Sequence, residues 1–410
     1  MKKFTLGVFF DVNIKSGGNF QESLNNIIIC NNLISKEIDI KIITTIPENI
    51  EFLKKLNIKC HLYSPSILSK IWQDLRSFSP NKIYRLIKFF NKKNNFEKFL
   101  EKLNIDLIYF CTQSLYVNYI ESLNFIFTVF DLAHQDYPEF PEVSNFRIFN
   151  EREIAFKKNL QRAVAVLSES ELGKKNLILK YNLEKNRVYV SPLGLRENFS
   201  LTKKINNVAS KKKNLNIKKK YNLKFDYIFY PAQFWAHKNH IYILKALKIL
   251  EKEEKINLGA IFSGSDQGNL SYIKYMTKKM NLEHRVRFAG FVANEELPLL
   301  YSQSIALVMP TYFGPTNIPP LEAFKFNVPV LYSNLPGLRE QVGKAALLLD
   351  LNEPKSLVYN LKKLINSKTL KNYLKTQGQL RLKQLSSKQN NSNNIKKIIK
   401  NFQIIRDCWK

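Results

Sequence analysis

The chain has 410 residues, a length that is too great for one compact core and that predicts two domains, or three. Apolar residues make up 45% of it, which excludes wholesale disorder. The formal net charge is +30, from 64 Lys and Arg against 34 Asp and Glu, and fits nucleic acid, an anionic membrane face or phosphorylated substrates as partners.

The cysteines indicate neither a zinc site nor a disulfide framework, because the four of them lie far apart, at positions 30, 60, 111 and 408. Four scattered cysteines without a disulfide pattern are consistent with a protein of a reducing compartment. No stretch of about 18 consecutive apolar residues occurs, and the short apolar run near the start ends in Asp11 and is typical of a first strand. We therefore expect a cytoplasmic protein, soluble or peripheral on the inner face of the cell membrane.

The first half alternates short apolar runs with helical patterns, which is typical of a parallel sheet. After the first strand, Gly17 and Gly18 precede a helical pattern with Phe20 and Leu24 on one face. A glycine loop between strand and helix can bring backbone amides close to a phosphate, although a simple turn explains the two glycines equally well. Strands are predicted at 5–10, 40–45, 59–63, 106–110, 125–130, 163–167 and 188–191.

Residues 66–103 interleave apolar and basic side chains at helical spacing, with Trp72, Phe89 and Phe90 among them. One interpretation is a helix pair that lies on an anionic membrane. Ordinary core-facing helices with solvated lysines are the alternative.

Asp131 and His134 follow the strand predicted at 125–130. Open α/β sheets bind ligands at the carboxyl ends of their strands, so both residues are candidates for a site. His134 can carry a proton or contact an acceptor hydroxyl, with Asp131 as its orienting partner. A hydrogen-bonded pair in a loop is the alternative.

Composition changes to Lys, Asn and Ser from about residue 202 to residue 220, as expected of a linker. Beyond it, strands are predicted at 227–230, 259–262, 286–288, 305–309, 328–332 and 346–349. The chain is therefore expected to be an α/β protein with parallel sheets in two Rossmann-like halves. We place the first domain at 1–200, the linker at 201–221, the second domain at 222–385 and a final helix at 386–410.

In the second half, the stretch from Pro310 to Phe324 predicts a strand, a tight loop and a helix. Pro319 and Pro320 suit the first turn of a helix, and Gly314, Thr316 and Asn317 can bend or cap the chain before it. The free amides of such a terminus attract phosphate. Glu322, which we place in the first turn, would then accept hydrogen bonds from ribose or sugar hydroxyls. An ordinary connection with a first-turn acid is the alternative.

Lys238 lies in the loop after the first strand of this half, where a cation can stabilise the charge of a leaving diphosphate. A solvated lysine is the alternative in so basic a chain. Gly264, at the end of the next strand, can lie against a nucleotide. No Asp-x-Asp occurs, so no metal and no cofactor is expected, and protein groups would have to balance the diphosphate.

Nearly the whole chain resembles the family-four retaining glycosyltransferases. The segments that carry the resemblance are 229–238, 264–266, 286–290 and 310–330, with Gly17-Gly18, Phe130-Asp131, Arg152-Glu153 and 191–194 in the first half. The resemblance implies the GT-B fold of two facing Rossmann-like domains, with the last helix crossing back to the N-terminal domain. It also implies a nucleotide-sugar donor on the second domain and a saccharide or lipid-linked acceptor on the first.

The resemblance also implies roles for single residues. Glu322 matches the second Glu of the family's Glu, seven residues, Glu motif and is expected on the ribose, whereas Gly314 stands at the first. Gln233 replaces a family arginine, and Phe130 a family histidine. A branch with Gly-Pro-Thr-Asn in the loop shares these departures, and many of its members build surface polysaccharide. Thr316, Asn317 and the amides through Ile318 would replace the missing carboxylate, and Gly18 would support the donor phosphate.

We therefore expect a retaining, metal-independent hexosyltransferase of surface polysaccharide. Lys238, Glu322, Asp131 and His134 are its expected catalytic groups. A nucleotide-sugar 2-epimerase of the same fold is the second hypothesis. A basic nucleic-acid-binding protein is the third, although no recognised nucleic-acid module appears and no nucleic acid is expected. A membrane-surface scaffold is the fourth.

Overall fold

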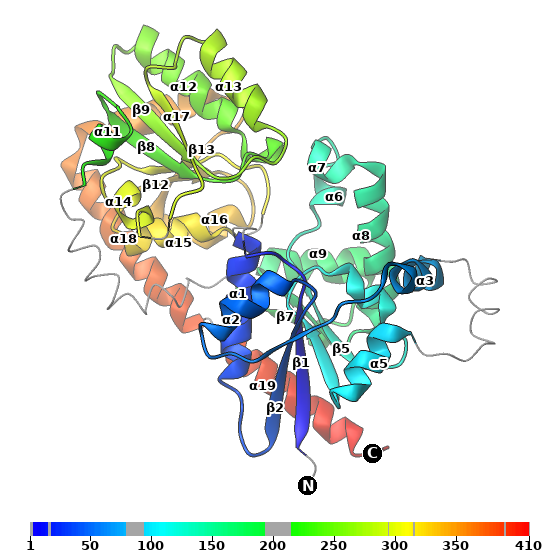
Figure 1. Cartoon of the computed structure of the whole chain (residues 1–410). Helices are drawn as coiled ribbons and strands as arrows, with labels where there is room; N and C mark the ends of the chain where they lie inside the picture. Colours follow the sequence, from blue (N-terminus) through cyan, green and yellow to red (C-terminus); the bar gives the residue numbers. More distant parts are fainter. Residues whose placement is uncertain are drawn as a thin grey trace. The chain divides into compact units, whose positions relative to one another are not determined.

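The computed structural model describes residues 3–14, 18–78, 94–192, 215–293, 295–314, 316–388 and 391–409. They form two compact units (Figure 1). Unit 1 comprises Met1–His134, Asn145–Pro192 and Gln389–Lys410, and unit 2 comprises Gln135–Ser144 and Leu193–Lys388. Gly17, most of the predicted linker and residues 79–93 of the basic stretch lie outside the described residues.

Unit 1 contains a parallel sheet in the order β3-β2-β1-β4-β5-β6-β7. Its strands are β1 (Phe4–Phe10), β2 (Ile38–Thr44), β3 (Cys60–Leu62), β4 (Leu107–Phe110), β5 (Phe125–Val129), β6 (Ala165–Ser168) and β7 (Val188–Val190). Its main helices are α1 (Gly18–Asn31), α2 (Pro47–Lys54), α3 (Ile67–Phe78), α5 (Asn95–Lys102), α8 (Phe146–Asn159), α9 (Glu171–Tyr181) and α19 (Asn391–Arg406).

Strand β1 shows why this sheet lies at the centre of unit 1. All seven of its residues are buried, and its large apolar side chains are divided between two apolar cores. Val8 and Phe10 belong to one core and Phe9 to the other, because successive side chains of a strand point to opposite faces. Helix α19 covers the first of these faces and buries Ile399 and Phe402 there.

Unit 2 contains a second parallel sheet, in the order β10-β9-β8-β11-β12-β13. Its strands are β8 (Asp226–Pro231), β9 (Leu258–Ser263), β10 (Val286–Gly290), β11 (Leu307–Met309), β12 (Val330–Ser333) and β13 (Ala346–Leu349). Its main helices are α7 (Pro141–Ser144), α11 (Ile217–Lys220), α12 (His240–Lys252), α13 (Leu270–Lys279), α14 (Leu297–Ser302), α15 (Ile318–Lys325), α16 (Leu338–Val342), α17 (Pro354–Asn366) and α18 (Lys368–Lys388).

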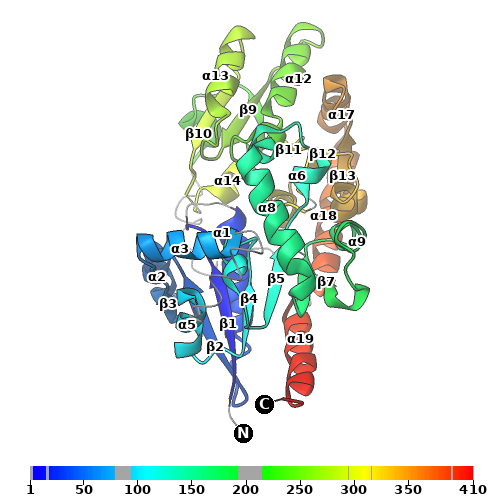
Figure 2. The ribbon, with the colours of Figure 1, turned by 90° about the vertical axis from the view of Figure 1, so that its right-hand side faces the viewer.

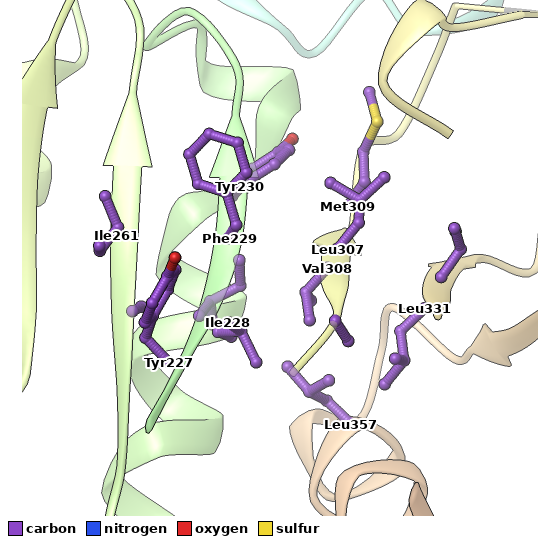
Figure 3. Close-up of a cluster of buried hydrophobic side chains, with 14 of the residues drawn as sticks. Tyr227, Ile228, Phe229, Tyr230, Ile261, Leu307, Val308, Met309, Leu331 and Leu357 are labelled. Carbon is purple, nitrogen blue, oxygen red and sulfur yellow. The ribbon is translucent and has the colours of Figure 1, made fainter. Parts of the chain in front are cut away.

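The core of unit 2 forms around β8 and β11, where Tyr227, Phe229 and Val308 are fully buried (Figure 3). Helices α12 and α17 pack against each other beside this sheet (Figure 2).

In both units the order of the strands reverses beside the first strand, and loops of different connections meet there at the carboxyl edge. That edge is where an open sheet of this kind binds ligands.

The prediction of two parallel, Rossmann-like sheets is confirmed, and the described residues contain a strand in each predicted position. One grouping was not predicted. Residues 135–144 lie within the first half of the sequence, yet they pack with unit 2. Among the described residues, no helix is long and apolar enough to cross a membrane.

Candidate functional site

In unit 2, the loops after β8 and β11 are tied together at the carboxyl edge of the sheet. The ammonium of Lys238 donates to Asn317 Oδ1 at 3.2 Å, and the amide of Tyr312 donates to the carbonyl of His237 at 2.9 Å. Beneath the loop, the hydroxyl of Tyr230 donates to the carbonyl of Lys238 at 2.8 Å. The structure therefore brings two of the predicted site residues, Lys238 and Asn317, into contact.

The side chain of Asn317 is oriented by its other partners. Its Nδ2 donates to the carbonyl of Gly314 at 3.1 Å and to the hydroxyl of Tyr332 at 2.6 Å. With both amide hydrogens used in this way, Oδ1 is the atom that faces Lys238. We predicted that this side chain would grip a sugar, whereas its amide contacts are internal and hold the lysine in place.

Gln341 of α16 fixes the backbone of the same loop. Its Oε1 accepts from the amide of Asn317 at 3.0 Å and from the hydroxyl of Tyr332 at 3.0 Å, and its Nε2 donates to the carbonyl of Asn317 at 2.6 Å. The backbone amide of Asn317, which we expected to help hold a diphosphate, is thus bound to Gln341 in this structure, and its contact with a diphosphate stays a prediction. Sequence spacing gave no signal for Gln341.

Helix α15 begins as predicted, with Asn317 as its N-cap and prolines in its first turn. Two corrections apply. The side chain of Asn317 makes no capping hydrogen bond, and Glu322 is the fifth residue of the helix, beyond the first turn. Glu322 is only 2% exposed, and its Oε2 accepts from the hydroxyl of Tyr301 at 2.8 Å. Its expected contact with a ribose remains a prediction.

Gly314, which stands where the family motif has a carboxylate, has a backbone that only glycine adopts readily. Its φ is +98°, in the left-handed region, and a Cβ there would lie 3.4 Å from Asn317 Oδ1. A glutamate would strain this backbone, although its Cβ would make only an ordinary contact with the amide that holds Lys238. The loop conformation thus explains why the carboxylate is missing.

Gly264 and Gln233 also meet at this edge. Gly264 has a φ of +152°, and a Cβ built on it would lie 2.4 Å from the carbonyl oxygen of Ala232. Only glycine therefore allows the loop after β9 to approach the loop after β8 so closely. Gln233 Nε2 donates to the hydroxyl of Ser265 at 3.1 Å, so this side chain lies between the two loops. Thr316 and Ile318 flank Asn317 at the start of α15.

Two histidines that we did not single out lie beside Lys238. His237 stacks on Phe313, with 3.8 Å between ring centroids, and His240, the first residue of α12, stacks on Phe234 at 4.5 Å. Burial, together with electrostatic interactions with Lys238 and His237, lowers the pKa of His240 to about 3. The imidazole beneath Lys238 is therefore neutral at physiological pH.

In unit 1, Asp131 and His134 lie at the carboxyl end of β5, as predicted, but they do not form the expected pair. Asp131 Oδ1 accepts from Arg152 at 2.9 Å, whereas His134 Nε2 contacts Glu153 Oε1 at 2.8 Å. The assignment of Asp131 as the orienting partner was therefore wrong. The reason is that α8 presents Arg152 and Glu153 side by side, and each residue of the loop meets one of them.

Burial separates the two residues further. His134 is fully buried, and burial lowers its pKa more than the hydrogen bond to Glu153 raises it. Its ring is thus enclosed in unit 1 rather than presented to an acceptor. Burial raises the pKa of Asp131, but the opposing effects of Arg152 and of the Ala133 amide are together larger, so the net shift is downward. Asp131 is therefore an ionised carboxylate at the strand end.

The same edge of unit 1 carries a second carboxylate that we did not single out. Asp11, directly after β1, accepts from the hydroxyls of Thr112 at 3.0 Å and Ser114 at 2.7 Å. Burial raises the pKa of Asp11 despite these two hydrogen bonds. The sequence signal that could have identified Asp11 is the position of an acidic residue directly after the first predicted strand. Gly18 is the exposed first residue of α1.

The described residues contain no group of three or more His, Cys, Asp and Glu side chains that could hold a metal ion. The residues that meet in unit 2 are a cation, amides and hydroxyls. Such a set suits an anionic ligand that carries hydroxyl groups.

Comparison with known proteins places this geometry in context. Residues 211–381 match the model of the family described as glycosyl transferases group 1. The O-antigen chain mannosyltransferase B of Escherichia coli is 26% identical over 202 residues, 49% of this chain and 51% of the relative. The O-antigen chain mannosyltransferase RfbU of Salmonella typhimurium is 27% identical over 230 residues, 56% of this chain and 57% of the relative. The chain thus spans about half the length of the curated relatives it matches.

Among solved structures, Anabaena Alr3699/HepE in complex with UDP-glucose has a TM-score of 0.66 to this chain at 15% sequence identity. The alignment covers 97% of this chain and 99% of that one. This likeness shows the fold, which is the two-domain GT-B fold with a parallel, Rossmann-like sheet in each domain.

The buried imidazole of His240 leads to a pH prediction for the stability of unit 2. Its folded pKa of about 3 lies below the ordinary value of 6.5, so the unfolded chain takes up a proton first as the pH falls. Stability that is present above pH 6.5 is lost progressively toward pH 3. When the pH falls from 6.5 to about 5, the free energy of unfolding of the wild type should decrease by about 2 kcal/mol more than that of His240→Phe.

The measurement is urea unfolding followed by the fluorescence of Trp235, with Trp72 and Trp409 replaced by Phe so that unit 2 alone is observed. His284→Asn is the control, because it removes a histidine whose side chain is 52% exposed. Equal acid sensitivity of the wild type and His240→Phe would contradict the prediction.

Proposed function

We propose that this chain is a glycosyltransferase that transfers a hexose from a nucleotide-sugar to a saccharide or lipid-linked saccharide acceptor, in the synthesis of a surface polysaccharide. The observation that carries the proposal is the contact of Lys238 with Asn317 at the carboxyl edge of the unit 2 sheet. Both residues lie within the segment that matches glycosyl transferases group 1. The coarser part of the proposal, a transferase of this group, rests on that match.

The contact suits the departure of a nucleoside diphosphate. As the bond between sugar and phosphate breaks, negative charge grows on the leaving oxygen, and a fixed cation in a dry site stabilises it. Lys238 is partly buried, and the Asn317 oxygen that it contacts belongs to an amide, which carries no formal charge. Gln233 and the amide of Ile318 would complete the contacts to the diphosphate, and Glu322 would take the ribose.

The finer features of the proposal come from the family resemblance and from the relatives. Retention of anomeric configuration and independence of metal follow from the resemblance to family four. Two of the relatives are mannosyltransferases, which supports mannose as the first hexose to test, and the UDP-glucose in the Anabaena structure supports a nucleotide-sugar donor. We place the acceptor at the carboxyl edge of unit 1, where Asp131 and Asp11 offer carboxylates to sugar hydroxyls.

We further propose that unit 1 contacts an anionic membrane through an apolar face of α3. The face consists of Ile67, Leu68, Ile71 and Leu75, which are 80%, 80%, 50% and 53% exposed. Its spacing is that of one side of a helix. Residues 66–103 hold nine Lys and Arg against three Asp and Glu, so an anionic surface is the complementary partner. A lipid-linked acceptor would be reached from such a surface.

A donor screen tests the proposed reaction. Thermal unfolding of the chain is measured with UDP, GDP, ADP and their sugar conjugates, GDP-mannose included, because a ligand that binds the folded state raises its stability. Transfer is then assayed with the sugar that shifts the midpoint. Donor consumption without an acceptor would favour the 2-epimerase, and salt-sensitive duplex binding with no nucleotide shift would favour the nucleic-acid hypothesis.

For Lys238→Ala we expect a larger loss in turnover than in donor binding, because the charge on the leaving oxygen is greatest in the transition state. The kcat should fall about 100-fold to 1,000-fold, with the nucleotide Kd changing far less. Lys245→Ala is the matched control, since this lysine is exposed on α12 in the same unit. Near-normal kcat in Lys238→Ala would exclude the leaving-group role.

The membrane contact is tested by sedimentation with vesicles that contain anionic lipid. Replacing Ile67 and Leu68 by Ser should weaken binding at least about 10-fold, because each side chain then loses apolar surface to bury in the bilayer. The control replaces Tyr272 and Tyr275, exposed aromatic residues of unit 2, by Ser. If both double variants sediment as the wild type does, α3 is not the contact surface.

A further inference from the structure

Residues 135–144 make a polar contact with the loop that carries Lys238. Glu142 Oε1 accepts from the backbone amide of His237 at 2.9 Å and contacts Nδ1 of the same residue at 2.5 Å. Both side chains are nearly buried, with 7% of Glu142 and 9% of His237 exposed. One carboxylate oxygen therefore holds both the backbone and the ring of the residue that precedes Lys238.

Aromatic packing joins the same segment to the loop after β11. Tyr137 stacks on Phe313 with 5.6 Å between ring centroids, and Phe140 lies 5.2 Å from Tyr312 and 5.6 Å from Phe313. Phe313 in turn stacks on His237 at 3.8 Å. The segment thus contacts both of the loops that meet at the Lys238–Asn317 contact.

These contacts hold the backbone of His237, the residue before Lys238, at both its amide and its carbonyl. The amide of His237 is bound to Glu142, and its carbonyl accepts from the amide of Tyr312 at 2.9 Å. With the backbone of His237 fixed, the Cα of Lys238 has little freedom, and its side chain is directed toward Asn317. A lysine carries high side-chain entropy, so a fixed backbone matters for placing its charge.

We infer that Glu142 is a positioning residue, which fixes the Lys238 ammonium through His237 for a ligand of the unit 2 site. The inference rests on the proposed function for its effect on turnover, whereas the contact itself is independent of the reaction. Burial raises the pKa of Glu142. The hydrogen bonds from His237 and the backbone together lower the pKa by more than burial raises it, so the net shift is downward. Glu142 is therefore charged at neutral pH and accepts strongly from both His237 groups.

The first arm of the test is hydrogen exchange of the His237 amide without substrate. In Glu142→Ala this amide loses its acceptor, and we expect exchange about 10-fold faster in peptides that cover residues 232–240. Glu142→Gln keeps an acceptor oxygen and should retain most of the protection. Glu139→Ala is the matched control, because Glu139 is an exposed glutamate in the same segment. Unchanged exchange in Glu142→Ala would overturn the inference.

The second arm measures steady-state kinetics on the donor found in the screen. Glu142→Ala should lower kcat about 10-fold to 100-fold, as expected for a misplaced catalytic group, with a smaller change in KM. Glu142→Gln should recover part of the loss, and the effects of Glu142→Ala and His237→Ala should be less than additive, because one acts through the other. A kcat in Glu142→Ala equal to that of Glu139→Ala would overturn the functional role.

The two arms separate this inference from the proposed function. A wild type that binds no nucleotide and transfers no sugar counts against the function alone. In that case, faster hydrogen exchange in Glu142→Ala that is confined to residues 232–240 would still support Glu142 as a positioning residue for another anionic ligand. Unchanged exchange in this variant would overturn the inference. Far-UV circular dichroism and the thermal midpoint confirm that each variant is folded.

Discussion

The contact between the Lys238 ammonium and Asn317 Oδ1 is the interaction on which the arrangement of the unit 2 loops depends. An asparagine amide can turn either its oxygen or its nitrogen toward a neighbour, and here the hydroxyl of Tyr332 and the carbonyl of Gly314 take both amide hydrogens. The orientation of Asn317 is thus set by buried groups. The cation is placed by a network rather than by one pair.

The choice of a neutral partner has an electrostatic consequence. A carboxylate next to Lys238 would compensate its charge and repel a diphosphate. The amide oxygen of Asn317 holds the ammonium without adding a negative charge beside it. The φ of +98° at Gly314 fits this arrangement, because it favours glycine at the position where the family motif has a glutamate. One loop conformation is therefore consistent both with a glycine in place of the motif's glutamate and with the position of Asn317 beside the lysine.

The sequence predicted the fold well because the strands carry their own signal. The run Leu6–Phe10 contains no polar side chain, and a central strand covered on both faces buries every residue of so short a run. The partners at the site carried no such signal. Asp131 and His134 are close in sequence, yet they pair with Arg152 and Glu153, which α8 brings to the strand end. Long-range pairing of this kind depends on how a helix packs, and spacing along the chain does not record it.

The amino terminus of α15 offers fewer free amide hydrogens to a phosphate than we expected from the sequence. The first four residues of α15 are Ile318, Pro319, Pro320 and Leu321, and proline has no amide hydrogen. The amide of the N-cap, Asn317, is already bound to Gln341. A helix of eight residues with two amide hydrogens in its first turn attracts an anion weakly. In the diphosphate site that we propose, we therefore assign the positive charge to Lys238. The residues that position this side chain, from Tyr230 beneath the loop to Asn317 beside it, then matter more than the helix.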